Sequence, residues 1–274
     1  MSNTSLRILS ALVMISVVSL AIWLSRYSVF VFIGAFSLIA VDEIVTNILK
    51  NRRWGVIYFI SQLCFLIPFL SIILLWPSAA VFQSFIYLGV ALNFILLWYL
   101  FFTDMDSDVF SRICSPFPFF SSLMVLLPMV SLIALLQFED WRWLLIGLLV
   151  INFGMDTGAW FFGKNFGKHK LWRRVSPNKT IEGLFGGMLT AGLFGGLFWP
   201  FAFGQWSVAL VILFCLLGGM SQMGDLVQSK VKRQCQIKDS SSLIPGHGGV
   251  YDRIDSLLFL TPFYALALNY FYIS

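Results

Sequence analysis

Charged residues are scarce in this sequence: they make up 11% of its 274 residues, whereas 59% are hydrophobic. A soluble domain carries about 25% charged and about 45–50% apolar residues. A chain with so few polar groups cannot cover its own surface in water. The composition therefore excludes a separate soluble domain and indicates that the lipid bilayer is the solvent of this protein.

The sequence also lacks the patterns of a disulfide framework, a zinc site and a cleaved leader. Its four cysteines contain no CxxC pair, so we expect small buried side chains rather than disulfides or zinc ligands. The first apolar run is followed by no small-x-small cleavage site, and we interpret it as a retained first helix. No repeat of about 20–50 residues is visible.

Long apolar runs dominate what is present, and their flat hydropathy favours helices, because strand edges in lipid would leave backbone groups unpaired. We predict an all-α fold, a polytopic transmembrane helix bundle. Polar groups recur at membrane level only after about residue 150, so we divide the chain into N-terminal transmembrane helices (1–140) and a C-terminal transmembrane catalytic region (141–274). About nine spanning helices are expected, near 6–25, 27–49, 55–76, 79–102, 117–137, 141–163, 182–199, 205–223 and 251–273.

Lys and Arg residues are distributed unevenly between the loops. With the N-terminus in the cytoplasm, only Arg26 and Arg142 fall outside. The positive-inside bias therefore predicts a cytoplasmic N-terminus and an outer C-terminus, in a bacterial-type cytoplasmic (inner) membrane. The net charge of +5 is thus concentrated on the cytoplasmic face, which is basic. We expect membrane lipid and anionic substrates to bind this face, and no nucleic acid.

The first informative polar segment is 152–160, inside an apolar run. Asp156 is a functional candidate, because an intramembrane carboxylate is costly. It shares a helix face with Asn152. A purely structural role, in which this face forms a hydrogen bond that joins two helices, is the alternative to a functional one. Gly154 and Gly158 predict a close contact with another helix.

The second segment, 163–183, alternates glycine, lysine and serine. Backbone N–H groups at glycines, together with lysines, are typical of phosphate binding, although a simple basic loop would look similar. Lys179 and Thr180 resemble the end of a Walker A loop, but the glycines that such a loop requires are absent. Ser176 and Pro177 fit a helix N-cap followed by a first-turn proline.

The third segment begins at the end of the eighth apolar run. If that helix continues past the membrane, four polar residues form one stripe along it: Asp225, Ser229, Lys232 and Arg233. A carboxylate and two cations on one stripe can hold a metal ion beside phosphates, or can form internal salt bridges.

The same segment continues into the start of the last helix. The glycine-rich turn 245–249 precedes Asp252 and Asp255, which lie three apart and so share a face. Glycines that lead into a helix N-terminus form an anion site, and neighbouring carboxylates can bring Mg²⁺ to the phosphates. Carboxylates and cations gathered at a membrane edge favour a nucleotide–metal site.

Residues 229–255 resemble the signature of the CDP-diglyceride synthase (phosphatidate cytidylyltransferase) family. The matching residues are Ser229-x-x-Lys232-Arg233-x4-Lys238-Asp239 and then His247-Gly248-Gly249-x-x-Asp252-Arg253-x-Asp255. Segments 156–160 and 176–183 resemble two further recurrent segments of that family, and the match covers roughly 150–260. One departure is the serine run 240–242, which we expect to affect only the mobility of the loop.

The resemblance implies an enzyme, commonly a homodimer, that transfers CMP from CTP to phosphatidic acid on the cytoplasmic side. The products would be CDP-diacylglycerol and pyrophosphate, in the first committed step of anionic phospholipid synthesis. Two other classes stay open: a transporter, and a CTP-using lipid kinase of the dolichol kinase type that would release CDP.

The resemblance also implies roles for individual residues. Asp225, Asp252 and Asp255 would hold one or two cations, Mg²⁺ first, and catalysis would rest on positioning and charge stabilisation rather than on a strong base. The implied catalytic residues are Asp225, Lys232, Arg233, Asp252, Arg253, Asp255 and Asp156. The implied substrate-binding residues are Lys179, Ser176, Asn178, Thr180, Ser229, Lys238, Asp239, His247, Gly248 and Gly249.

Overall fold

The structure is a computed structural model that describes residues 3–107, 109–114 and 117–272. Within these residues, nine helices are long and apolar enough to cross a membrane, which confirms the predicted all-α architecture. They are α1 (Asn3–Leu24), α2 (Arg26–Glu43, continued by the π-helical turn η1, Ile44–Ile48), α3 (Val56–Leu75), α4 (Ala79–Phe102), α6 (Pro118–Ala134, continued by the 3₁₀ turn η2, Leu135–Gln137), α7 (Trp141–Phe166), α8 (Ile181–Phe203), α9 (Val208–Gln234) and α10 (Tyr251–Phe271).

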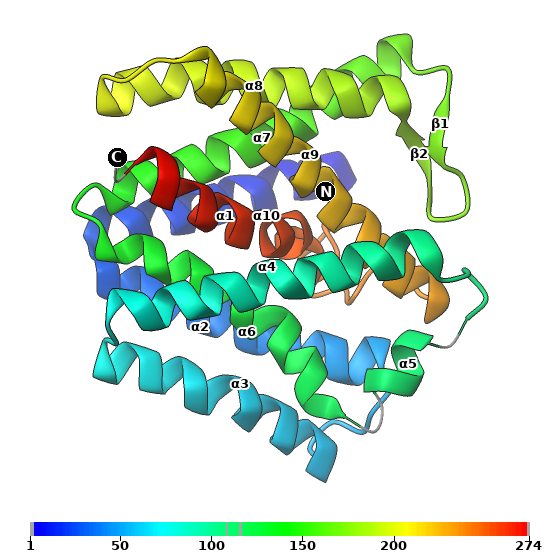
Figure 1. Ribbon diagram of the computed structural model, residues 1–274. Coiled ribbons are helices and arrows are strands. Elements are labelled where there is room, and N and C mark those ends of the chain that lie inside the picture. The colour runs from blue at the N-terminus through cyan, green and yellow to red at the C-terminus, as the bar shows by residue number, and fades with distance from the viewer. Residues whose placement is uncertain (1–2, 108, 115–116, 273–274) are drawn as a thin grey trace.

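Three short elements lie outside these spans. Helix α5 (Val109–Cys114) follows α4, and the strands β1 (Lys170–Trp172) and β2 (Ser176–Thr180) form an antiparallel hairpin between α7 and α8. Figure 1 shows the long helices side by side, with the hairpin and α5 at the right-hand end of the bundle. The C-terminus lies at the opposite, left-hand end.

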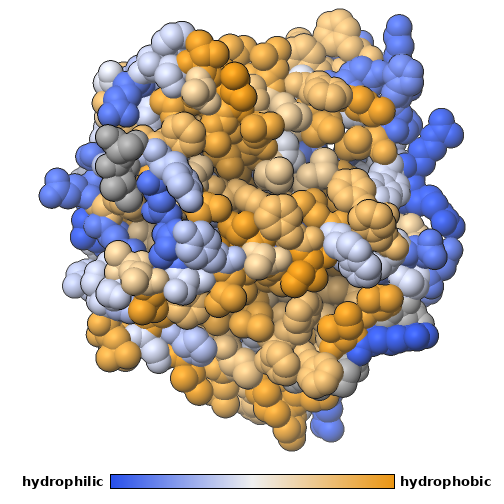
Figure 2. All heavy atoms as spheres, in the orientation of Figure 1, coloured by the Kyte–Doolittle hydropathy of each residue, from blue (hydrophilic) through white to orange (hydrophobic). Residues whose placement is uncertain are grey.

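The surface agrees with a position across a bilayer. In Figure 2 hydrophobic side chains cover most of the middle of the visible face, and hydrophilic side chains gather at its right and left ends. Large apolar side chains such as Leu74 and Phe201, each more than three-quarters exposed, are explained by contact with lipid rather than water.

The hairpin corrects one detail of the sequence interpretation. Ser176 and Pro177 do not start a helix; they lie in β2, and α8 begins at Ile181. A residue before proline is held extended, and proline is tolerated in an edge strand, so both suit a two-stranded hairpin. Thr180 is the N-cap instead, because its hydroxyl accepts a hydrogen bond from Gly183 N at 3.1 Å.

The two parts of the chain share one core, because α10 packs against α4 and α6 as well as against α9. Asn93 of α4 donates a buried hydrogen bond of 2.8 Å to the carbonyl of Phe259 in α10. Asn152 of α7 accepts one of 2.8 Å from Ser221 of α9, so this residue does serve to join two helices. The N-terminal helices therefore hold the helices that carry the signature residues.

Candidate active site at one end of the bundle

Helix α9 continues to Gln234, eleven residues beyond the predicted end of its apolar run at 223, and carries the whole predicted stripe. The Ser229 hydroxyl donates to Asp225 Oδ1 at 3.1 Å. Asp225 Oδ2 lies 2.5 Å from Nζ of Lys179, which is contributed by β2. The fold thus joins the second and third informative segments of the sequence through one ion pair.

A second ion pair joins α9 to the start of α10. Lys232 Nζ lies 2.7 Å from Asp252 Oδ1 and 3.8 Å from Asp255 Oδ2. Asp252 Oδ2 accepts hydrogen bonds from the backbone N–H groups of Ser240 and Gly249, at 2.8 and 2.9 Å. Asp252 therefore uses both of its oxygens within the protein.

Asp225 of α9 lies within electrostatic range of one carboxylate on each of two other helices. Asp225 repels both Asp255 of α10 and Asp156 of α7. Lys179 attracts both of the repelled carboxylates, and Arg253 also attracts Asp156. Asp156 has an exposed side chain on α7, so it faces the outside of the bundle at the edge of this cluster. Like charges held close together favour the presence of cations between them.

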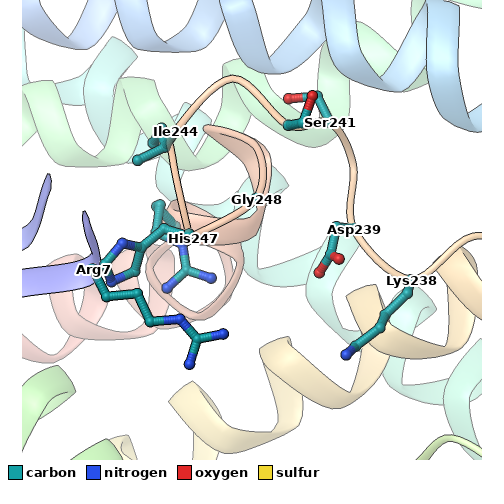
Figure 3. Close-up of a pocket in the computed structure, with 10 residues that line it drawn as sticks. Arg7, Lys238, Asp239, Ser241, Ile244, His247 and Gly248 are labelled. Carbon is teal, nitrogen blue, oxygen red and sulfur yellow. The ribbon is translucent and has the colours of Figure 1, made fainter. Parts of the chain in front are cut away.

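An open cavity of about 510 Å³ shares one residue, Arg253, with this cluster. Its charged lining residues are Arg7, Lys238, Asp239 and Arg253, so cations outnumber carboxylates three to one. In Figure 3, Arg7 extends from α1 beside His247, while Lys238 and Asp239 lie on the segment that follows α9. A polar, cationic hollow of this size suits a phosphorylated small molecule.

The glycine-rich turn forms one wall of the cavity. Gly246 and Gly248 have φ angles of +75° and +84°, which L side chains rarely adopt. These angles present His247 towards α1, where its Nδ1 lies 2.7 Å from the Ser10 hydroxyl. Burial and then the charge of Arg253 lower the pKa of His247, which favours the neutral form of the imidazole. A neutral imidazole agrees with a role as loop organiser or hydrogen-bond partner.

Other predicted binding residues lie in different environments. Thr180 is buried as a helix cap, and the Gly249 N–H is already bound to Asp252. Asn178 is exposed on the hairpin, and Ser176 is half-buried there. Arg233 donates a long hydrogen bond of 3.4 Å to the carbonyl of Ile237.

The serine run differs from what the sequence suggested. Ser240 is 1% exposed and its hydroxyl lies between the carboxylates of Glu43 and Asp252, at 2.7 and 3.0 Å. Ser241 also donates to Glu43, at 2.6 Å. The expectation that these serines only make the loop mobile is wrong, because two of them are fixed by buried carboxylates.

Sequence reasoning missed three residues of this end of the bundle. Arg7 and Lys230 belong to no motif and contribute only to the charge asymmetry of the loops, and Glu43 is a single carboxylate in the second apolar run. The Lys230 ammonium is completely buried and donates to the carbonyls of Tyr99 and Leu100, at 2.9 and 3.0 Å. The sequence does contain one signal for Glu43, because a carboxylate within a membrane-spanning run is costly and therefore a functional candidate.

The carboxylates fit a magnesium ion in part. Among the described residues, no three His, Cys, Asp or Glu side chains are gathered as a ready-made metal site. Both oxygens of Asp252 and of Asp225 have partners within the protein, whereas Asp255 Oδ2 has only the long contact with Lys232. Asp225 and Asp255 lie close enough to repel each other, so a cation shared by the two would relieve that repulsion. Mg²⁺ is commonly held by one or two carboxylates together with substrate phosphates and water, so this pair fits the ion.

Known proteins resemble this chain over much of its length. The sequence profile of the "Cytidylyltransferase family" matches residues 5–271. Three similar proteins are each named phosphatidate cytidylyltransferase. The one from Staphylococcus epidermidis is 44% identical over 125 residues, 45% of this chain and 48% of the relative. The one from Bacillus subtilis is 41% identical over 127 residues, 44% of this chain and 46% of the relative.

The third relative, from Staphylococcus haemolyticus, is 38% identical over 198 residues, 70% of this chain and 74% of the relative. The chain thus spans about half the length of the first two relatives and nearly three-quarters of the third. The profile match extends over almost the whole sequence, including the N-terminal helices. The chain belongs to the cytidylyltransferase family.

Proposed function

We propose that this protein transfers the cytidylyl group of CTP to phosphatidic acid and releases pyrophosphate. The observation that carries the proposal is the cationic cavity beside the carboxylate cluster, with Arg253 lining the cavity and also acting on Asp156. One arginine thus connects the open hollow with Asp156, whose side chain is exposed on α7. A reaction between a soluble anion and a lipid anion requires such a junction.

The chemistry is the attack of a phosphate oxygen of phosphatidic acid on the α-phosphorus of CTP. The new phosphorus–oxygen bond forms while the bond to the bridging oxygen of the β-phosphate breaks, and pyrophosphate leaves with those electrons. Both reactants are anions, so their repulsion is the main obstacle. Lys179 and Lys232 stand at the cluster and Lys238 at the cavity, where they would bind phosphate oxygens and lower that repulsion.

We propose that Asp225 and Asp255 hold Mg²⁺ when the nucleotide binds. The ion would supply positive charge to the triphosphate and so favour departure of the pyrophosphate. Asp252 would act differently: by holding Lys232 and the backbone of 240 and 249, it fixes the positions of groups around the ion. Loss of activity on chelation and its return with Mg²⁺ would test this assignment.

We also propose where each substrate binds. The triphosphate would occupy the cavity, and the lipid phosphate would approach from the exposed side of Asp156, which the exposed rings of Phe153 and Trp160 flank. Arg7→Ala should then raise the KM for CTP several-fold and leave the KM for phosphatidic acid nearly unchanged. Arg52→Ala, an exposed arginine outside the cavity, serves as the control. Equal effects of both variants would contradict this placement.

The localisation and assembly are proposals on the same basis. Positive-inside charge and bacterial relatives support a position in the inner membrane with the site on the cytoplasmic face. The resemblance to the family supports a homodimer, which the mass of the protein in nanodiscs would test.

The decisive experiment identifies the product of purified protein given labelled CTP and phosphatidic acid. Pyrophosphate together with CDP-diacylglycerol supports the proposal. Release of CDP with a phosphorylated lipid would indicate a lipid kinase, and the absence of any turnover would favour a transporter. Phosphatidic acid should be required, and diacylglycerol without a phosphate should not replace it.

A further inference from the structure

Glu43 is a buried carboxylate at the far end of α2, in the half of the chain that otherwise consists of apolar helices. It is 2% exposed, and the helix changes to a π-helical turn directly after it. Irregular π turns within helices are frequent at functional sites. A carboxylate in this position is costly unless several donors surround it.

Four donors do surround it, and all of them lie between Ser240 and Tyr251, in the segment that leads from α9 into the first residue of α10. Glu43 Oε1 accepts from the Ser241 hydroxyl at 2.6 Å and from Val250 N at 3.0 Å. Glu43 Oε2 accepts from the Ser240 hydroxyl at 2.7 Å and from Tyr251 N at 2.8 Å. The carboxylate of α2 therefore binds a segment about two hundred positions further along the chain.

Two of these donors are the backbone N–H groups of Val250, the N-cap of α10, and of Tyr251, its first residue. A helix N-terminus leaves such groups without intrahelical partners, and the N-cap residue, Val250, has an apolar side chain that cannot accept a hydrogen bond. Glu43 supplies the missing acceptor from another helix, and its negative charge faces the positive end of the helix dipole. Gly249 makes the approach possible, because a Cβ there would overlap Ser240 Oγ and Glu43 Oε2.

The same contacts continue into the candidate active site. Ser240 Oγ lies 3.0 Å from Asp252 Oδ2, the other oxygen of Asp252 is bound to Lys232, and Lys232 reaches Asp255. A single hydroxyl proton serves one carboxylate at a time, so Ser240 couples the placement of Glu43 to that of Asp252. An unbroken series of contacts thus leads from Glu43 through Ser240 and Asp252 to Lys232.

We propose that Glu43 is a positioning residue of the active site, which caps α10 from α2 and, through Ser240, fixes Asp252 and the Lys232–Asp255 contact. The inference rests on the proposed cytidylyl transfer. It gives the N-terminal half of the chain a catalytic task beyond crossing the membrane, since Glu43 acts through other residues without touching substrate.

The test uses the full-length protein in nanodiscs and compares Glu43→Gln with Asp42→Asn. Both variants change a carboxylate to an amide at neighbouring positions, but Asp42 pairs with the exposed Arg53 and not with the start of α10. Glu43→Gln should speed amide hydrogen exchange of Val250 and Tyr251 at least about tenfold, because an amide group offers its NH₂ to donors. It should also lower kcat at least about thirtyfold with little change in the KM for CTP. Asp42→Asn should do neither.

Unchanged exchange at these two amides would overturn the inference, whatever the activity. Faster exchange with a wild-type kcat would also overturn it, because Glu43 would then only stabilise the fold. If the wild-type protein shows no cytidylyl transfer, the proposed function is wrong. The hydrogen-exchange measurement would still show whether Glu43 caps α10. If Glu43→Gln does not fold, Ser240→Ala takes its place: a kcat about tenfold lower supports the coupling, and a wild-type kcat overturns it.

Discussion

Asp225→Asn isolates the charge that the active-site proposal needs most. The amide has nearly the volume of the carboxylate, so packing in α9 is retained, but the ion pair with Lys179 at 2.5 Å and the attraction for a cation are lost. The fold should tolerate the change, because the variant also relieves the repulsion that Asp225 exerts on Asp255 and Asp156. Stability and rate therefore respond differently to one substitution.

The magnitude follows from the loss of a charge contact made in the transition state. Such a loss costs on the order of 3 kcal/mol, and each 1.36 kcal/mol is about a factor of ten in rate, so kcat should fall at least about a hundredfold. The measurement is the initial rate of pyrophosphate release at saturating CTP and phosphatidic acid in detergent micelles. The thermal unfolding midpoint of the same preparation shows whether the protein is folded.

Asp106→Asn is the matched control, because that side chain is 83% exposed and pairs loosely with Arg174 at 3.3 Å. Its kcat should stay within about twofold of wild type, as expected for an exposed ion pair. Asp108, in the same loop, was also expected to be merely solvated, but it lies outside the described residues. A folded Asp225→Asn protein that keeps more than about a tenth of the wild-type kcat would refute the reasoning, since the missing charge would then not be catalytic.

Three further predictions concern stability and topology. Lys230→Met should destabilise the protein by about 3 kcal/mol, because buried carbonyls lose their cation. Its thermal unfolding midpoint should fall well below that of the control Lys168→Met, which changes an exposed lysine. Equal midpoints for the two variants would contradict this prediction. The lowered pKa of His247 means that its contribution to stability is complete above the ordinary histidine pKa of about 6.5 and is lost as pH falls through the folded value. The thermal unfolding midpoint of the wild type should therefore fall more between pH 7.5 and 5 than that of His247→Gln. Equal falls in the two midpoints would contradict the lowered pKa of His247. Reporters fused within 165–178 and after residue 274 should report opposite sides of the membrane, as the charge asymmetry predicts, and reporters on one side would mean a miscounted helix.

Local patterns in the sequence predicted the helices well. Hydropathy and length are properties of each apolar run by itself, and in lipid a run of that length has almost no alternative to a helix. The eighth run shows the limit of this reasoning. Its apolar part ends at 223, yet α9 continues to Gln234, because packing of Lys230 and Lys232 against α4 and α10 stabilises the polar turns.

The sequence by itself determined the membrane-spanning architecture, and its motifs marked the residue types of the candidate site. Only the tertiary structure decided which charges meet. Lys179 and Asp225 are paired by the hairpin, Arg7 enters the cavity from α1, and Glu43 caps α10. The physical reason is that an ion pair or a cap depends on the distance between atoms, whereas hydropathy and spacing describe only neighbours along the chain. Hydropathy alone assigns no task to Glu43 in the second apolar run, whereas the fold surrounds it with four hydrogen-bond donors from the segment that leads into α10.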